Sequence, residues 1–230
     1  TAWYAWNPLV VYAFAGGGHF DSVMVALMTA AIWALHRANP LDRGLFAWNW
    51  SLLSGVLLGA AISIKIVPVL LVPLWLMTLG RRWVAVLPGL AVPLVLACLY
   101  GFPEVNVFDS LGKFAEVART NDVVWWVVDS VVAAQPEVLN TVAHFLIVFL
   151  AGVFALVFAH NWRRGTLWVL GAALLLSPVF HAWYLPWILP VAAWRRSYPW
   201  FVFSVSMFVY FLLWVPGLSG LAWTPTPVYR

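Results

Sequence analysis

The sequence predicts an all-α fold, a polytopic transmembrane helical bundle. Hydrophobic residues make up 64% of the 230-residue chain and charged residues only 9%, whereas soluble domains are about half apolar and about a quarter charged. The mean hydropathy is +0.93. Long uncharged runs recur, and each approaches the roughly 20 residues that a membrane-spanning helix needs. These runs do not alternate apolar and polar residues, so they do not resemble the strands of a membrane barrel.

Arginines between the apolar runs predict how the chain crosses the membrane. Lys and Arg near helix ends concentrate on the cytoplasmic side, so we place these arginines inside. They are Arg37, Arg43 and the pairs Arg81–Arg82, Arg163–Arg164 and Arg195–Arg196. Successive runs then cross in alternate directions, which gives about eight spans. The predicted spans are 21–36, 46–64, 66–79, 84–100, 141–159, 167–176, 185–194 and 199–215.

This topology predicts one integral membrane domain over residues 1–230, with an external loop at 101–140. Within the loop, residues 110–120 predict an amphipathic helix that lies in the membrane interface. The polar stretches 15–22 and 177–184 fall on the same external side. The chain starts at Thr1 and shows no leader pattern, so we expect it to be part of a longer protein.

The stretch AGGGHFDS (15–22) interrupts two apolar runs. Glycines let a ligand or another backbone come close. Asp21 or Ser22 is a predicted N-cap for a helix that begins at Val23, and the same helix terminus would attract a phosphate. His19 and Asp21 are close enough in sequence to act on one ligand. A capped helix after a flexible turn is the simpler interpretation.

Lys65 is isolated within a long uncharged run. A charge at the bilayer centre costs roughly 2.5–3.5 kcal/mol on insertion scales. The ammonium group must therefore extend to the external interface or pair with an anion. Pro68 and Pro73 remove backbone donors and distort the run that follows. The functional interpretation makes Lys65 the counter-ion of a lipid phosphate.

The stretch SPVFHAWYLPWILP (177–190) contains a histidine between helix-breaking prolines. Non-helical backbone at membrane depth must line protein or a cavity. His181, beside Trp183 and Tyr184, is a candidate proton shuttle, hydrogen-bond donor or metal ligand. The alternative is an interfacial histidine that is only hydrogen-bonded. The single cysteine, Cys98, excludes a disulfide framework.

Three segments of the chain, in order, resemble a known family: 6–27 (WNPLVVYAFAGGGHFDSVMVAL), 55–75 (GVLLGAAISIKIVPVLLVPLW) and 177–190. They are similar to the GT-C glycosyltransferases that use polyprenyl-phosphate sugars, in the mannosyltransferase-like branch with a DUF2029-type domain. The resemblance implies an integral, inverting enzyme in the cell membrane. It would transfer a sugar, here mannose, from a polyprenyl-phosphate donor to a glycan or glycolipid acceptor on the external (periplasmic or lumenal) face.

The resemblance also implies roles for individual residues. Asp21 and His181 would be catalytic, with His181 at the donor phosphate or the acceptor. The implied substrate-binding residues are Asn7, His19, Ser22, Lys65, Trp183 and Tyr184. Lys65 and the helix terminus at Ser22 would hold the lipid phosphate, and Trp183 and Tyr184 would line the pocket.

The chain departs from the family pattern in one respect. The usual catalytic carboxylate lies in the first external loop, after the first transmembrane helix. We therefore expect a C-terminal portion that lacks N-terminal helices, unless Asp21 replaces that acid. The sequence contains no dedicated metal site, so no cofactor is expected, although some GT-C enzymes use a divalent metal.

Two other function classes fit part of the sequence. A flippase or transporter of lipid-linked sugars would explain Lys65 and the broken helices, but transporters tend to be built from repeats and no internal repeat is seen. A non-catalytic membrane subunit would need no catalytic acid. Nucleic-acid binding is not expected, because the basic residues are scattered between apolar runs.

Overall fold

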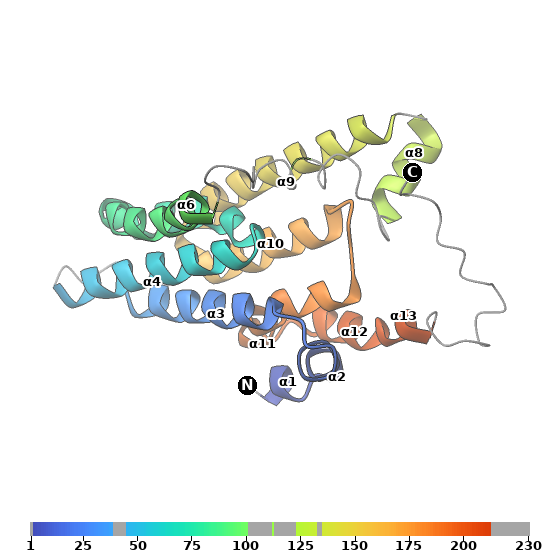
Figure 1. Cartoon of the computed structure of the whole chain (residues 1–230), viewed down its shortest axis with the longest axis horizontal. Helices are drawn as coiled ribbons and strands as arrows, with labels where there is room; N and C mark the ends of the chain where they lie inside the picture. Colours follow the sequence, from blue (N-terminus) through green and yellow to red (C-terminus); the bar gives the residue numbers. More distant parts are fainter. Residues whose placement is uncertain (1, 39–44, 101–111, 113–122, 133–134, 213–230) are drawn as a thin grey trace.

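The computed structural model describes residues 2–38, 45–100, 112, 123–132 and 135–212. Over these ranges every regular element is helical and none is a β-strand, so the all-α prediction is confirmed. Four helices lie side by side along the long axis of the molecule (Figure 1). They are α3 (Asp21–Arg37), α4 (Leu45–Ile64), α9 (Pro136–Phe158) and α10 (Trp162–Leu176).

The N-terminal segment is short and irregular. It contains α1 (Ala2–Ala5), α2 (Pro8–Val10) and a π-helical turn at Val11–Gly16. Asn7 caps α2, because its Oδ1 accepts hydrogen bonds from the backbone N–H groups of Leu9 at 3.0 Å and Val10 at 3.4 Å. Its Nδ2 donates to Ser204 Oγ at 2.7 Å. Asn7 therefore fastens this segment to α12 (Tyr198–Ser206).

Glycines allow α4 and α6 (Leu87–Tyr100) to pack at backbone contact. Gly55 and Gly59 of α4 face Gly89 of α6. A methyl group added at Gly59 would overlap the Gly89 carbonyl, and one added at Gly89 would overlap the Gly55 carbonyl. Small residues commonly permit this close approach in membrane helices, where packing rather than apolar burial drives association. These three positions fix how α4 lies in the bundle.

Prolines and a turn shape the segment between α4 and α6. A 3-10 helix at Val67–Leu71 leads into α5 (Val72–Leu79), and a second 3-10 helix covers Gly80–Val86. Gly80 has a φ of +52°, a backbone conformation that favours glycine. α5 packs against α9. The continuous predicted spans 66–79 and 84–100 are thus each divided between 3-10 and α-helix.

The C-terminal described segment is also divided. After α10, a 3-10 helix covers Ala182–Trp187, followed by α11 (Leu189–Arg195), α12 and α13 (Phe208–Leu212). Pro186 lies inside the 3-10 helix and cannot donate a backbone hydrogen bond. The chain is therefore non-α-helical where His181 and its neighbours lie.

Part of the predicted loop 101–140 is helical. Residues Val123–Val132 form α8, and α9 begins already at Pro136. Trp125 of α8 is buried, and its Nε1 donates to the Leu176 carbonyl at 2.6 Å, which satisfies a backbone group at the end of α10. The interfacial helix predicted at residues 110–120 lies outside the described residues except for Gly112.

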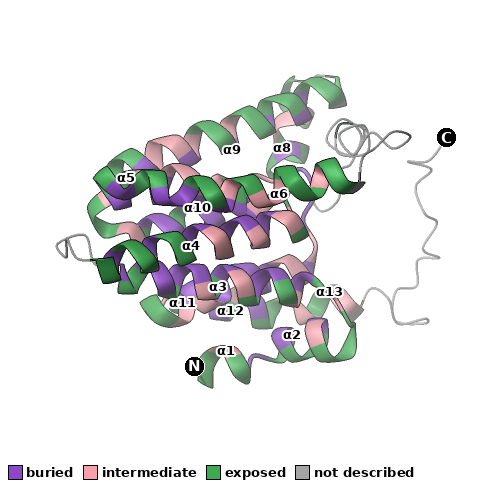
Figure 2. Ribbon diagram, turned by 60° about the vertical axis from the view of Figure 1, so that its left-hand side comes forward, coloured by how far each residue is buried: buried purple, intermediate pink, exposed green. Residues whose placement is uncertain are grey.

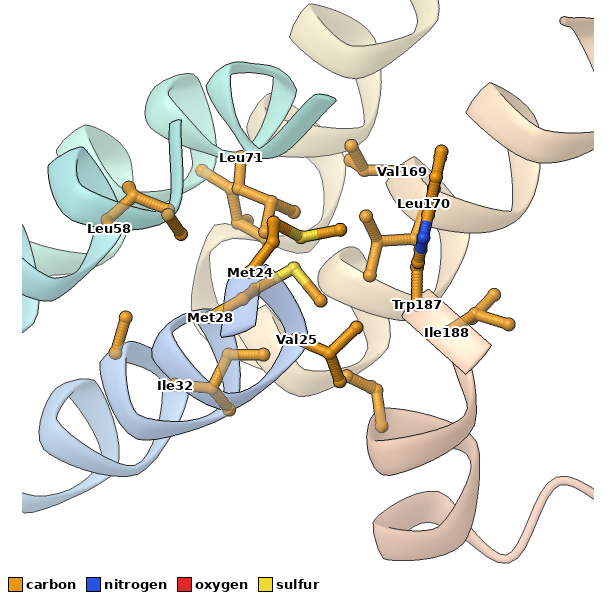
Figure 3. Packing of buried hydrophobic residues seen from close by; sticks show 14 of the residues in the cluster. Met24, Val25, Met28, Ile32, Leu58, Leu71, Val169, Leu170, Trp187 and Ile188 are labelled. Carbon is orange, nitrogen blue, oxygen red and sulfur yellow. The ribbon is translucent and has the colours of Figure 1, made fainter. Parts of the chain in front are cut away.

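The core lies between α3, α4 and α10. Figure 3 shows Met24, Met28 and Ile32 of α3 facing Leu58 of α4, with Leu170 of α10 and others opposite. By contrast, α6 and α9 expose large apolar side chains such as Leu94 at 63% and Phe145 at 74% (Figure 2). Extended exposed apolar surface of this kind indicates contact with lipid or a partner.

The prediction of about eight spans is not supported. Among the described residues, three helical stretches are long and apolar enough to cross a membrane: Leu45–Ile64, Val67–Leu99 and Glu137–Leu176. The predicted spans 185–194 and 199–215 fail because they are interrupted. α11 has 7 residues and α12 has 9, whereas a bilayer core of about 30 Å needs roughly 20 helical residues.

Candidate functional site

An ion pair joins two of the candidate residues. Lys65 Nζ lies 2.9 Å from Asp21 Oδ1, and the side chains are 27% and 6% exposed. Lys65 directly follows α4 and Asp21 begins α3, so the antiparallel packing of these helices places the two charges at the same end. A buried carboxylate is expensive unless it is paired, and Lys65 supplies that pairing.

Aromatic rings complete the surroundings of this ion pair. Trp187 Nε1 donates to the same oxygen, Asp21 Oδ1, at 3.1 Å. Lys65 Nζ lies 4.1 Å from the ring centroid of Tyr184 and 4.4 Å from that of Trp187. The two rings stack at 4.2 Å. The ammonium group is thus held by a carboxylate and two π faces.

Two histidines stack with one tryptophan beside the ion pair. The ring centroid of Trp183 is 4.9 Å from that of His19 and 4.3 Å from that of His181, and both pairs are nearly parallel. His181 also contacts Tyr184 edge to face at 5.2 Å. The buried Nδ1 of His181 has no hydrogen-bond partner. The segments 15–22 and 177–190 therefore meet, although they are far apart in sequence.

Burial and charge shift two pKa values in this region. The pKa of His181 lies below its ordinary value, first because burial disfavours the cation and then because Lys65 and His19 repel it. Burial, with a smaller contribution from Asp21, raises the pKa of Tyr184 to about 12. Near neutral pH His181 is accordingly a neutral imidazole, able to accept a proton, and Tyr184 remains a phenol.

The predicted N-cap role of Asp21 or Ser22 is wrong. α3 begins at Asp21 itself, and the preceding residue, Phe20, makes no side-chain cap hydrogen bond. The carboxylate of Asp21 is engaged by Lys65 and Trp187 instead, and a buried charge gains more from these partners than from a helix terminus. Ser22 is half-buried, and its backbone N–H donates to the His19 carbonyl at 3.2 Å.

The structure brings together most of the candidate residues. Asp21, Lys65, His19, His181, Trp183 and Tyr184 form one connected group. Asn7 is buried, and its amide is used in the α2 cap and the bond to Ser204. No group of three or more His, Cys, Asp or Glu residues able to hold a metal ion occurs in the described ranges.

Sequence reasoning missed Trp187. Its indole bonds the buried carboxylate and contacts Lys65, yet its position in a tryptophan-rich chain with 17 such residues gave no reason to select it. A signal was present: Tyr184 and Trp187 are three residues apart in one proline-interrupted segment, so a 3-10 helix places both rings on one face.

Comparison with known proteins gives a match to a family model. Residues 1–81 match the family model described as alpha-(1->6)-mannopyranosyltransferase, N-terminal domain. No curated protein and no solved structure matches the chain. The match supports a likeness to mannosyltransferases over these residues. The matched residues include Asp21 and Lys65, whereas His181 and its aromatic neighbours lie beyond them.

Proposed function

We propose that this chain is the membrane domain of a multi-pass GT-C mannosyltransferase that takes mannose from a polyprenyl-phosphate donor. The observation that carries the proposal is the Asp21–Lys65 ion pair. Both of its residues lie in the matched region. Glycosyl transfer from a lipid phosphate needs a base for the acceptor hydroxyl and donors for the departing phosphate. A carboxylate, an ammonium group and an imidazole can supply both.

Asp21 acts as the general base in this proposal. Its Oδ1 is occupied by Lys65 and Trp187, which leaves Oδ2 to receive a proton. The hydroxyl oxygen of the acceptor attacks the anomeric carbon of mannose and inverts it, while the bond from that carbon to the phosphate oxygen breaks. The bonding electrons leave with the phosphate, and the hydroxyl proton passes to Asp21.

Lys65 stabilises the departing phosphate. Because its side chain is 27% exposed, a phosphate can approach the ammonium group. A donor phosphate then competes with the Asp21 carboxylate for Lys65 Nζ. Contact with the phosphate weakens the hydrogen bond that Lys65 Nζ donates to Asp21 Oδ1. Donor binding would in this way prepare the base.

His181 contacts Tyr184, one of the two rings against Lys65. Its neutral imidazole can donate a hydrogen bond to a phosphate oxygen or orient the acceptor hydroxyl. The stack with Trp183 and His19 fixes the ring plane, which limits the loss of rotational freedom on binding. The same stack and Tyr184 would form one wall of the sugar-phosphate site.

The proposed site faces the external side. This follows from the arginine pairs, which place the opposite end of α3 in the cytoplasm. An external site suits a polyprenyl-phosphate donor, because the lipid holds the sugar phosphate at the membrane surface. The acceptor would be a glycan or a glycolipid at the membrane surface.

The test uses membranes that contain the full-length protein. Labelled polyprenyl-phosphate mannose and, separately, labelled nucleotide mannose are supplied, and transfer to membrane acceptors is measured. We expect transfer from the lipid donor alone. Asp21→Asn should reduce it by about 10²–10⁴-fold, the usual contribution of a general base. Protein abundance and the melting temperature are measured beside activity.

Glu137→Gln is the matched control, since Glu137 is an exposed acid at the start of α9, in the other part of the bundle. It should keep wild-type activity. Wild-type rates in Asp21→Asn would remove the catalytic assignment. Transport of the labelled lipid across vesicles, without covalent transfer, would favour a flippase instead.

A further inference from the structure

Arginines and tryptophans gather at the C-terminal end of α3, away from the proposed catalytic site. We call this group the arginine–tryptophan cluster. It consists of Trp33, His36, Arg37, Trp50, Trp162, Arg163 and Trp194. The residues come from α3, α4, α10 and α11. The mechanism proposed above uses none of them.

Each arginine of the cluster rests on a pair of tryptophan rings. Arg37 Cζ lies 6.0 Å from the Trp33 centroid and 5.5 Å from that of Trp50, and the two rings meet edge to face at 4.9 Å. Arg37 is exposed. Stacking on a ring holds a guanidinium in place while its planar N–H groups stay free to bind a ligand.

Arg163 repeats this arrangement on the neighbouring helices. Its Cζ lies 5.4 Å from the centroid of Trp162 and 4.9 Å from that of Trp194. Its Nη2 lies 2.8 Å from His36 Nδ1, and its buried Nε has no hydrogen-bond partner. The guanidinium of Arg163 is thus positioned by three rings but retains unused donors.

The cluster has a positive charge that no acid offsets within the described residues. The Lys65–Asp21 ion pair lies at the opposite end of α3 and does not involve the cluster. The connecting segment outside the described residues adds one acid and one base, Asp42 and Arg43, so it leaves the net charge of this end unchanged. The positive charge of the cluster therefore attracts an anion from the surroundings.

We propose that the arginine–tryptophan cluster binds the phosphodiester headgroup of an anionic phospholipid. Guanidinium groups bind phosphate oxygens through paired N–H donors, and tryptophan favours the membrane–water interface. A lipid is favoured over a soluble phosphate because apolar side chains adjoin the cluster at the start of α4: Leu45 is 84% exposed and Phe46 is 58% exposed. These side chains suit acyl chains.

The test measures binding of short-chain phosphatidylglycerol to the purified full chain in a neutral detergent. Intrinsic tryptophan fluorescence and the melting temperature report binding, and short-chain phosphatidylcholine and glycerol phosphate are titrated in parallel. We expect phosphatidylglycerol to bind about tenfold more tightly than either, as a charged hydrogen-bonded pair predicts. Arg37→Gln with Arg163→Gln should abolish that preference.

Arg81→Gln with Arg195→Gln is the matched control. It removes the same charge from two arginines that make no ring contact within the described residues, and it should leave the preference intact. Arg37→Lys with Arg163→Lys keeps the charge and removes the planar fork, so it should lose most of the preference even if the glutamine variant fails to fold.

Three results would overturn the proposal. Equal binding of phosphatidylglycerol and phosphatidylcholine by the wild type would exclude a headgroup site. Equal losses in the cluster and control variants would indicate unspecific attraction of a basic surface. Equal binding of glycerol phosphate would indicate a soluble phosphate ligand rather than a lipid.

Discussion

The two ends of α3 carry charge in different ways. At the N-terminal end, one buried acid is paired with one lysine and held by an indole. At the C-terminal end, the exposed Arg37 and the half-buried Arg163 rest on tryptophan rings, and neither forms an ion pair with a described acid. α3 has 17 residues, so at 1.5 Å per residue these ends lie about 25 Å apart.

The difference shows how each environment decides the way a charge is held. A carboxylate that is 6% exposed loses its hydration, so it needs a partner within the protein. An exposed guanidinium keeps much of its hydration, and an aromatic surface is enough to order it. The charges of the first end are therefore paired within the protein, whereas the guanidinium groups of the second end are held by rings and retain donors for a ligand.

The largest effect is expected where α4 is fixed, because α4 connects the two ends through Trp50 and Lys65. Gly59→Ala would place a methyl group on the Gly89 carbonyl, and overpacking of this kind costs about 1–3 kcal/mol or more. We expect a lower melting temperature in detergent and weaker function at both ends. Gly152→Ala, where nothing lies within 4 Å, should be neutral. A Gly59→Ala variant with the wild-type melting temperature would contradict this prediction, because it would show that α4 and α6 can move apart at no cost.

The second prediction compares the two ends directly. Lys65→Met leaves the Asp21 carboxylate buried without its cation, which should cost roughly 3 kcal/mol of folding free energy. Arg163→Met removes ring contacts of a partly exposed cation and should cost about 1 kcal/mol or less. Thermal unfolding of both variants in one detergent measures the difference.

Asp21→Asn combined with Lys65→Met is the control for this comparison. It removes both charges, so it should recover much of the stability that Lys65→Met loses. If the double variant is no more stable than Lys65→Met, then the ion pair is not the cause of the loss.

The third prediction concerns pH at the N-terminal end of α3, where Asp21 lies. The pKa of His181 in the folded protein lies below 6.5 because of burial, Lys65 and His19. Over the interval below 6.5 the unfolded chain binds more protons, so stability falls as the pH drops toward the folded pKa and then levels off. The melting temperature from pH 7.5 to pH 4.5 measures this fall.

His181→Gln should reduce that pH dependence, because the side chain no longer titrates. His144→Gln is the control on α9, since His144 Nδ1 lies 2.7 Å from the Asn140 carbonyl, outside the site. An unchanged pH profile in His181→Gln would mean that another group is responsible.

The smallest effect is expected in the arginine–tryptophan cluster, at the C-terminal end of α3. Trp50→Leu removes one of the two rings beneath Arg37 and should cost about 0.5–1 kcal/mol. Trp50→Phe keeps a ring and should cost less. A loss as large as that of Lys65→Met would show that the cluster is a structural centre, which would weaken the contrast between the two ends.

Much of the helical pattern could be predicted from local sequence. The predicted runs 21–36 and 46–64 agree closely with α3 and α4, because each is a long apolar segment bounded by polar residues. The predicted spans 66–79 and 185–194 were less accurate. Prolines at 68, 73, 186 and 190 divide those runs into short 3-10 and α-helical pieces, and composition alone does not indicate where each piece ends.

The sequence by itself determined the all-α fold and the residue types of the candidate site, since apolar runs, proline breaks and isolated charges are local features. Only the tertiary structure decided which groups meet. Asp21 and Lys65 are 44 positions apart, and Asp21 and Trp187 are 166 apart. Their contacts depend on how α3 and α4 pack and on how the 3-10 helix after α10 packs against the start of α3. Local sequence does not encode these relations, because they arise from side chains packing across the whole bundle.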